Sequence, residues 1–202
     1  MSLDLKNPWK TFSYPKGEKQ WFLDGGWKRW AKEYYDVLFT LKDIRKVRNR
    51  INRVGREKPE FKENNYFHEW KAAIELYTKH KCRSVLALYS PEKEASSPHR
   101  KKAEEVRGRV PPKVWNVIKP RKKGATQKKN EKTAVHAGLP DLFVYRDDNK
   151  DKWFYFAEVK GPGDRIGAMQ KKKSKLLDDA AGKEVSGIIK LEMTTEPFTP
   201  PR

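Results

Sequence analysis

Two strand-like segments joined by a short polar turn constrain the fold of this chain more than any other feature. Residues 139–145 and 153–160 are rich in aliphatic and aromatic side chains, and residues 146–152 between them are all polar. This pattern predicts a β-hairpin. The hairpin in turn determines which side chains of the two strands lie opposite each other.

The register of this hairpin would bring acidic side chains together. Glu158 and Lys160 are two residues apart and share a face of their strand. With the turn centred near residues 149 and 150, Asp141 lies opposite Glu158, where Cβ atoms are about 4.5–5.5 Å apart. Two carboxylates at so short a distance repel each other unless a cation lies between them. Mg²⁺ commonly binds one or two carboxylates together with water molecules. A register slip of one residue would separate the pair.

Four further elements are expected around the hairpin. Apolar periodicity and end signals predict two helices and two strands, at residues 65–80, 83–89, 164–181 and 185–193. Asp164 is expected to be the N-cap of the second helix, and Gly182 ends it. The order αβββαβ predicts an α/β fold with a mixed central sheet flanked by helices.

The chain is strongly basic, with a formal net charge of +19 over 202 residues. Such a charge indicates a polyanionic partner, which is DNA, RNA or an anionic membrane, although excess lysine also aids solubility. A basic run is predicted to be a solvated loop without ligand and to be available for phosphate contacts; it includes Lys119, Arg121, Lys122, Lys123, Lys128 and Lys129.

Three parts of the chain are distinguished. Residues 1–60 are expected to form an aromatic-rich irregular stretch to residue 26 and then a long amphipathic, basic helix, as an N-terminal helical arm. Residues 61–193 form the α/β domain, with a basic insertion at 90–137 that carries one short helix near residues 100–107. Residues 194–202 are expected to be a flexible tail. The long helix either packs on the domain or contacts DNA or a second subunit.

Composition also indicates the cellular location in which the protein is expected. No apolar run approaches the ~20 residues of a membrane-spanning helix, and no signal peptide is evident. Cys82 is the only cysteine, so neither an intramolecular disulfide nor a cysteine metal cluster is expected. We therefore expect no membrane partner and an intracellular protein that is not secreted: cytoplasmic, associated with the nucleoid or acting in an infected host cell.

Glu69 is a candidate third acid. On the helix at 65–80 it falls within the apolar arc, where a glutamate needs a buried partner such as a metal ion or Lys160. The alternative is that Glu69 lies at the edge of the arc and reaches solvent. Lys160 itself would orient or deprotonate a water, or neutralise charge in a transition state. Its alternative role is a structural ion pair with Glu158.

Several motifs together resemble a known family. They are Gly138-Leu139-Pro140-Asp141-Leu142, Glu158-Val159-Lys160-Gly161-Pro162-Gly163-Asp164-Arg165, and Gln170. This combination is similar to the VRR-NUC domain, a branch of the PD-(D/E)XK nucleases. It is closest to the catalytic domain of the Fanconi-associated nuclease and its stand-alone bacterial and phage relatives.

The resemblance implies a restriction-endonuclease-like fold and an Mg²⁺- or Mn²⁺-dependent nuclease for DNA, often branched DNA, as in DNA repair. Asp141, Glu158 and the carbonyl of Val159 would bind metal, with Glu69 as a further ligand. Lys160 would serve catalysis and Gln170 would support the site. Arg165 would support its own loop or contact phosphate. Lys171 and Lys172 are also candidates for phosphate contacts, although they stand in a segment that departs from the family, in which an aromatic residue often follows the glutamine.

Three functions remain open at this point. The first is a structure-selective endonuclease for flaps, splayed arms or junctions, for which a two-fold homodimer is expected when the substrate is a four-way junction. The second is a general or restriction-like nuclease. The third is a DNA-binding module that has kept the nuclease fold without catalysis. Charge alone does not separate DNA from RNA.

Overall fold

The predicted hairpin lies at the centre of the sheet. In the computed structural model, which describes residues 10–34, 37, 66–86, 97–118, 138–146 and 153–201, strands β3 (Leu142–Arg146) and β4 (Phe154–Lys160) are antiparallel. Leu142 pairs with Ala157 and Phe143 with Phe156, so the predicted register is confirmed. Continued by one residue, this register sets Asp141 opposite Glu158.

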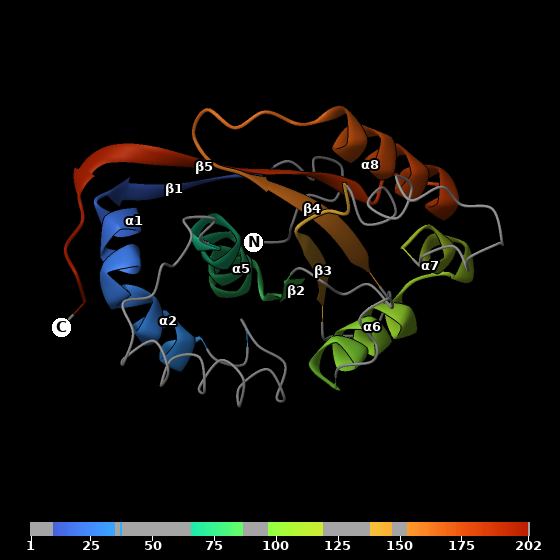
Figure 1. The fold of residues 1–202 in the computed structure, drawn as a ribbon, viewed down its shortest axis with the longest axis horizontal. Helices are drawn as coiled ribbons and strands as arrows, with labels where there is room; N and C mark the ends of the chain where they lie inside the picture. Colours follow the sequence, from blue (N-terminus) through green and yellow to red (C-terminus); the bar gives the residue numbers. More distant parts are fainter. Residues whose placement is uncertain are drawn as a thin grey trace, which may run out of the picture.

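Three further strands complete a mixed five-stranded sheet of order β1-β5-β4-β3-β2 (Figure 1). Strand β2 (Cys82–Leu86) is antiparallel to β3, and β5 (Ser186–Pro197) is parallel to β4. Strand β1 (Lys10–Lys16) adds to the far side of β5 in parallel. The mixed α/β class expected from the sequence is confirmed.

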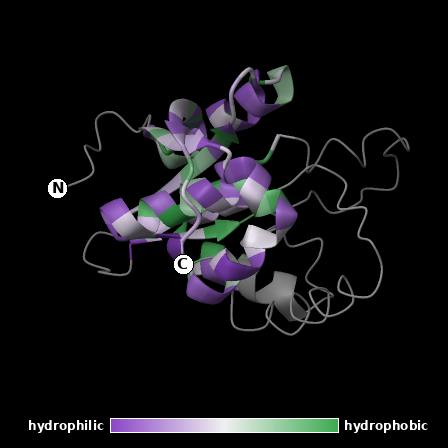
Figure 2. Ribbon diagram, turned by 90° about the vertical axis from the view of Figure 1, so that its left-hand side faces the viewer, coloured by the Kyte–Doolittle hydropathy of each residue, from purple (hydrophilic) through white to green (hydrophobic). Residues whose placement is uncertain are grey.

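Alternation along the strands divides the interior into two cores. On one face, Leu142, Val144 and Tyr155 pack with helix α5 (Phe67–His80) and the N-terminal helical segment. On the other face, Phe143 and Phe156 pack with three helices, α6 (Ser97–Arg109), α7 (Pro112–Ile118) and α8 (Ala168–Ala181). Figure 2 shows hydrophobic residues concentrated on the strands and hydrophilic residues toward the outside.

The N-terminal segment differs from the expected irregular stretch and helical arm. It begins with β1, continues through α1 (Glu18–Trp21) and η1 (Phe22–Gly26), and then forms α2 (Trp27–Glu33). The predicted helix starts at Trp27 as expected, but Tyr34 leaves helical geometry with φ −109° and ψ 34°. Its predicted continuation from residue 38 to residue 54 lies outside the described residues.

Three other elements differ from the sequence-based expectation. The helix expected near residues 100–107 is the longer α6, and α7 was not predicted because Pro111 and Pro112 suggested a break. Pro112 instead occupies the first turn of α7, where a missing N–H has no cost. Strand β5 continues to Pro197 instead of ending at residue 193. Beyond it, Phe198 N donates to Lys16 O at 3.0 Å.

Phe67 joins the N-terminal segment to the domain. Its side chain is fully buried, and its ring lies 5.1 Å from Tyr14, 5.4 Å from Phe22 and 5.7 Å from Trp30. An ion-pair network reinforces the same contact, since Lys71 Nζ lies 2.9 Å from Glu18 and 3.2 Å from Glu75. None of the described helices meets the length and apolarity that crossing a membrane requires.

Replacing Phe67 with alanine should lower the free energy of unfolding by about 3–5 kcal/mol, because it removes a buried aromatic ring and leaves a cavity. Urea denaturation measures the change. The control is Tyr66→Ala at the neighbouring, 48% exposed residue, which should change stability by no more than about 0.5 kcal/mol. Equal losses in the two variants would show that Phe67 does not join the segments.

Candidate active site

The acids and the lysine meet where β3 begins and β4 ends. Asp141 directly precedes β3, and its Oδ2 accepts a hydrogen bond from Val159 N at 2.9 Å. Lys160 Nζ donates to Glu158 Oε1 at 2.8 Å. Glu158 is only 3% exposed. The hairpin pairing therefore brings all three side chains to one end of the central strands.

Asp141 and Glu158 face each other across the hairpin, and their carboxyl groups interact through their charges and a side-chain hydrogen bond. Burial raises the pKa of Asp141 above its usual range. Burial first, and then the charge of Asp141, raise the pKa of Glu158 to about 7, although Lys160 opposes the shift. As carboxylates neither group can donate, so their contact requires a shared proton or a cation.

Glu69 comes to the same place from the first turn of α5. Burial, followed by the charge of Asp141, raises its pKa to about 7, while Lys160 lowers it. The side chain is partly buried and interacts with the charges of both hairpin residues. Of the two interpretations of Glu69, the position favours the one in which it faces the other charged groups.

Gln170 connects Glu158 to the start of α8. Its Oε1 accepts from Gly167 N at 2.8 Å, and its Nε2 donates to Glu158 Oε1. The first contact fixes which end of the amide carries the NH₂ group, so the second is necessarily a donation to the carboxylate. The loop between β4 and α8 thus brings together two residues that are twelve positions apart in the sequence.

Gly138 explains the turn before Asp141. It has φ +82°, and a Cβ atom on it would lie 2.5 Å from Met169 O and 2.7 Å from Met169 C. Only glycine permits both this backbone conformation and this approach. The turn that presents Asp141 therefore packs directly on the first turn of α8, next to Gln170.

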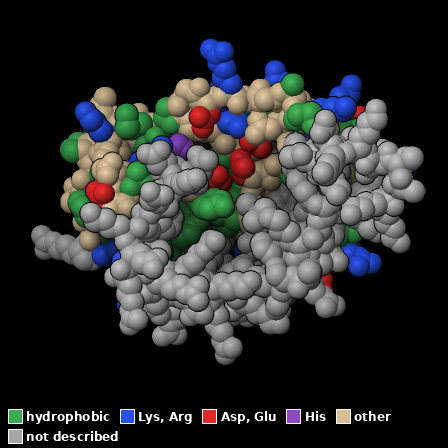
Figure 3. Space-filling model, in the orientation of Figure 1, with side chains coloured by type: hydrophobic (Ala, Val, Ile, Leu, Met, Phe, Trp, Pro, Cys, Tyr) green, Lys and Arg blue, Asp and Glu red, His purple; other side chains and the backbone are tan. Residues whose placement is uncertain are grey.

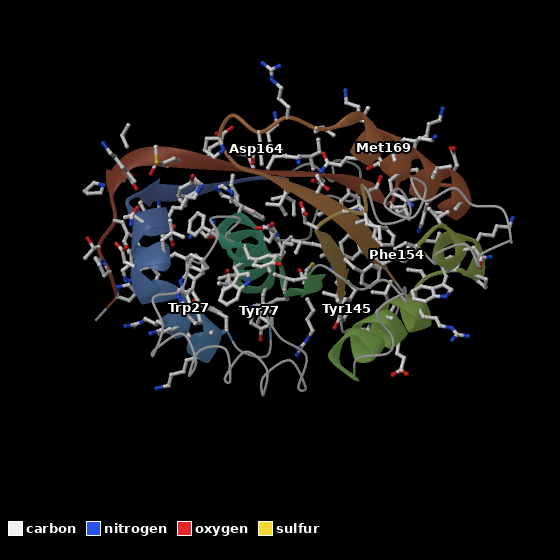
Figure 4. The ribbon with its side chains drawn as sticks, in the orientation of Figure 1. Trp27, Tyr77, Tyr145, Phe154, Asp164 and Met169 are labelled. Atoms are coloured by element: carbon white, nitrogen blue, oxygen red, sulfur yellow. The ribbon has the colours of Figure 1, made fainter. Side chains whose placement is uncertain are left out.

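The loop after β4 differs from its expected role. Asp164 was predicted to cap the helix, but α8 starts at Ala168 and its N-cap is Gly167. Asp164 instead closes a turn, since its Oδ2 accepts from Gly161 N at 2.8 Å and its N–H donates to Gly161 O at 3.2 Å. Figure 4 labels Asp164 on this connection between β4 and α8 and Met169 in the first turn of α8.

Basic side chains flank the acids. Arg165, Lys171 and Lys172 are exposed, on the loop and in the first turn of α8 beside Gln170. Figure 3 shows acidic side chains grouped near the middle of one face and Lys and Arg side chains projecting at its edge. The six basic residues of the predicted run at 119–129 lie outside the described residues.

Asp141 and Glu158 are the oxygen donors available to a metal ion at this site. Across the described ranges, no three His, Cys, Asp or Glu side chains form a group that could hold a metal ion. Asp141 and Glu158 do make a close pair, and Glu158 Oε2 is buried without a hydrogen-bond partner among these residues. An acid pair with a free buried oxygen fits a hard divalent ion that keeps most of its waters.

Comparison with known proteins agrees with this geometry. The family model of the VRR-NUC domain matches residues 116–185, which contain Asp141, Glu158, Lys160 and Gln170. The resemblance found in the sequence is confirmed over this range, and it indicates a nuclease domain with a restriction-endonuclease-like fold. Helix α5 and strand β1 lie outside the match. No curated protein matches the chain at a significant level.

In the absence of divalent cations, the wild type should lose free energy of unfolding relative to Glu158→Gln as pH rises from about 5 to about 8. The pKa of Glu158 is about 7 in the folded protein, against a usual value of 4.5. The folded state therefore holds this proton more tightly. The resulting stabilisation is full below about pH 4.5 and is lost as pH rises through about 7, whereas glutamine stays neutral throughout.

The shift should reach on the order of 1–3 kcal/mol. Thermal unfolding in EDTA at several pH values measures it. Glu192→Gln, an exposed change on β5, is the matched control and should give a curve parallel to the wild type. A parallel curve for Glu158→Gln as well would contradict the raised pKa.

Proposed function

We propose that this chain is a divalent-metal-dependent endonuclease that hydrolyses phosphodiester bonds in DNA, with a preference for flapped or branched substrates. The VRR-NUC match is the premise. The observation that carries the proposal is the buried contact between the carboxyl groups of Asp141 and Glu158, with Lys160 donating to the second of them. Two ionised acids in such a place are unfavourable, and a cation that joins them relieves their repulsion as a shared proton does.

Asp141 and Glu158 would hold the metal, with the Val159 carbonyl and Glu69 as further ligands that the resemblance implies. Mg²⁺ and Mn²⁺ both suit oxygen donors of this kind. When bound, the ion lowers the pKa of a coordinated water and stabilises charge on phosphate oxygens. Val159 N–H holds Asp141 in the orientation that faces Glu158.

Lys160 supplies the positive charge of the protein at this site. Its side chain is 14% exposed, and its donation to Glu158 holds the ammonium group beside the acids. A phosphodiester placed there gains negative charge in the transition state, and a fixed ammonium group neutralises part of it. Lys160 would also orient or deprotonate the attacking water.

Gln170 and the Gly138 turn keep this arrangement rigid. Gln170 ties Glu158 to the N-terminus of α8, and Gly138 seats the turn of Asp141 on the same helical turn. Each acid is therefore held against one structural element. Such support from surrounding residues is what fixes catalytic groups to within a fraction of an ångström.

Asp141→Asn and Lys160→Ala should each lower the rate of metal-dependent cleavage by 100-fold or more, on the order expected for losing a group that acts in the transition state. End-labelled duplex, single-stranded, 5′-flap and four-way-junction DNA are incubated with Mg²⁺ or Mn²⁺, and with EDTA. Asp179→Asn on α8 and Lys32→Ala on α2, both exposed, are the matched controls and should cut as the wild type does.

The relative cleavage rates of the four DNA substrates distinguish a structure-selective nuclease from a general one. Preference for flap or junction DNA supports structure selectivity, and a junction cutter should also be a two-fold dimer by light scattering. Equal cutting of plain duplex would replace it with a general or restriction-like nuclease. Tight, salt-sensitive binding without cleavage under any metal would overturn catalysis and favour a DNA-binding module.

The basic start of α8 is proposed to contact the DNA backbone. Changing Lys171 and Lys172 to alanine should weaken binding uniformly across DNA sequences and reduce the slope of log affinity against log salt by about 1 for each lost phosphate contact. Fluorescence anisotropy at several salt concentrations measures both. Lys28→Ala with Lys32→Ala on α2 is the charge-matched control. An unchanged salt slope in the α8 variant would remove this helix from the interface.

A further inference from the structure

A histidine ring lies against the residue that follows Lys160. The edge of the His68 ring faces Gly161, and a Cβ atom on that glycine would lie 2.7 Å from His68 Nε2 and 2.8 Å from Nδ1. Real Cβ atoms do not approach other atoms so closely. Gly161 is not among the glycines with positive φ. The ring, and not the backbone conformation, therefore excludes a side chain here.

Two aromatic residues pack against the His68 ring. Its ring is 5.9 Å from the ring of Tyr14 on β1 and 5.3 Å from that of Phe67 on α5. Tyr14 is 3% exposed and packs edge-on against Phe67. Within the described residues, His68 Nε2 is buried and has no hydrogen-bond partner. The ring edge that meets Gly161 thus acts through packing.

Gly161 is the point at which β4 turns away from the sheet. It follows Lys160 directly, and both its N–H and its carbonyl are bonded to Asp164. Val159, on the same side of the strand as Gly161, belongs to the core that contains Tyr14 and Phe67. A displacement of Gly161 along the direction of the His68 ring would therefore move the backbone of Lys160.

We propose that His68, backed by Tyr14 of the N-terminal strand, is a positioning residue that sets the end of β4 and hence the approach of Lys160 to Glu158. This inference rests on the proposed function. It also gives the N-terminal segment a part in that function, because neither His68 nor Tyr14 lies within the residues matched by the VRR-NUC domain. His68 acts through Gly161 and touches no reacting group.

A double-mutant cycle of Gly161→Ala and His68→Ala tests the contact. Gly161→Ala should reduce the single-turnover cleavage rate by about 10- to 100-fold, as expected when a catalytic group is displaced by about 1 Å. DNA affinity should stay within about 2-fold, because the proposed backbone contacts of Lys171 and Lys172 lie on α8. In the His68→Ala background, the same glycine change should have almost no further effect, since the methyl group then has room.

His80→Ala is the matched control. His80 lies in the last turn of the same helix, and its ring is 6.1 Å from Phe12 of the same strand β1. This variant removes a histidine contact between α5 and β1 without touching Gly161, so it should keep the cleavage rate of the wild type. Equal effects of Gly161→Ala in both backgrounds, or an unchanged rate in His68→Ala, would overturn the proposal.

Hydrogen exchange provides a measurement that does not depend on cleavage. In His68→Ala, amides of residues 158–166 should exchange faster, because the turn held by Asp164 loses its support; His80→Ala should leave them unchanged. If the wild type cuts no DNA, the proposed function fails while this exchange result still decides whether His68 braces the turn. Unchanged exchange in His68→Ala would overturn the positioning role whether or not the protein cuts DNA.

Discussion

The pairing of Leu142 with Ala157 sets the register of the two central strands, and every other feature of the site follows from it. In that register, alternate residues enter the two cores, and the residues just beyond the last pairs are Asp141 and Glu158. A slip of one strand by one residue would place either Phe143 or Phe156 on the wrong face as well as separating the acids. The same large aromatic side chains that stabilise the sheet thereby specify the site.

Burial of the acids works against stability, and the surrounding structure offsets it. Glu158 is held by Lys160 and Gln170, and Asp141 by the backbone of Val159. Each of these groups comes from the hairpin or from α8, which pack on one another through Gly138. The two acids repel each other electrostatically, but hydrogen bonds hold each of them in place. That combination suits a site that binds a cation and a phosphodiester together.

The sequence predicted the parts of the fold whose signals are local. The strand pair, its register, α5, α8 and the charged residues at their junction all depend on side-chain alternation, helical periodicity and motif spacing. Strand β1 was missed although Phe12 and Tyr14 alternate with polar residues, because Pro15 and Gly17 suggested a turn and the partner strand lies at the far end of the sequence. The contact between His68 and Gly161 was missed for a related reason. Packing between separate helices and strands produces no regular spacing of residues in the sequence.

The position of β1 has a consequence for how the protein is made. Lys10 pairs with Ile189, so nearly all of the described chain must be synthesised before the first strand has a partner. Contacts this distant in sequence form late and slowly. Until β5 has left the ribosome, Tyr14 has no sheet to join, and the aromatic cluster behind the end of β4 is incomplete. A nascent chain would therefore carry the acids and the lysine before Tyr14 packs behind His68, and on the positioning role proposed for His68 its site would align only once β5 has formed.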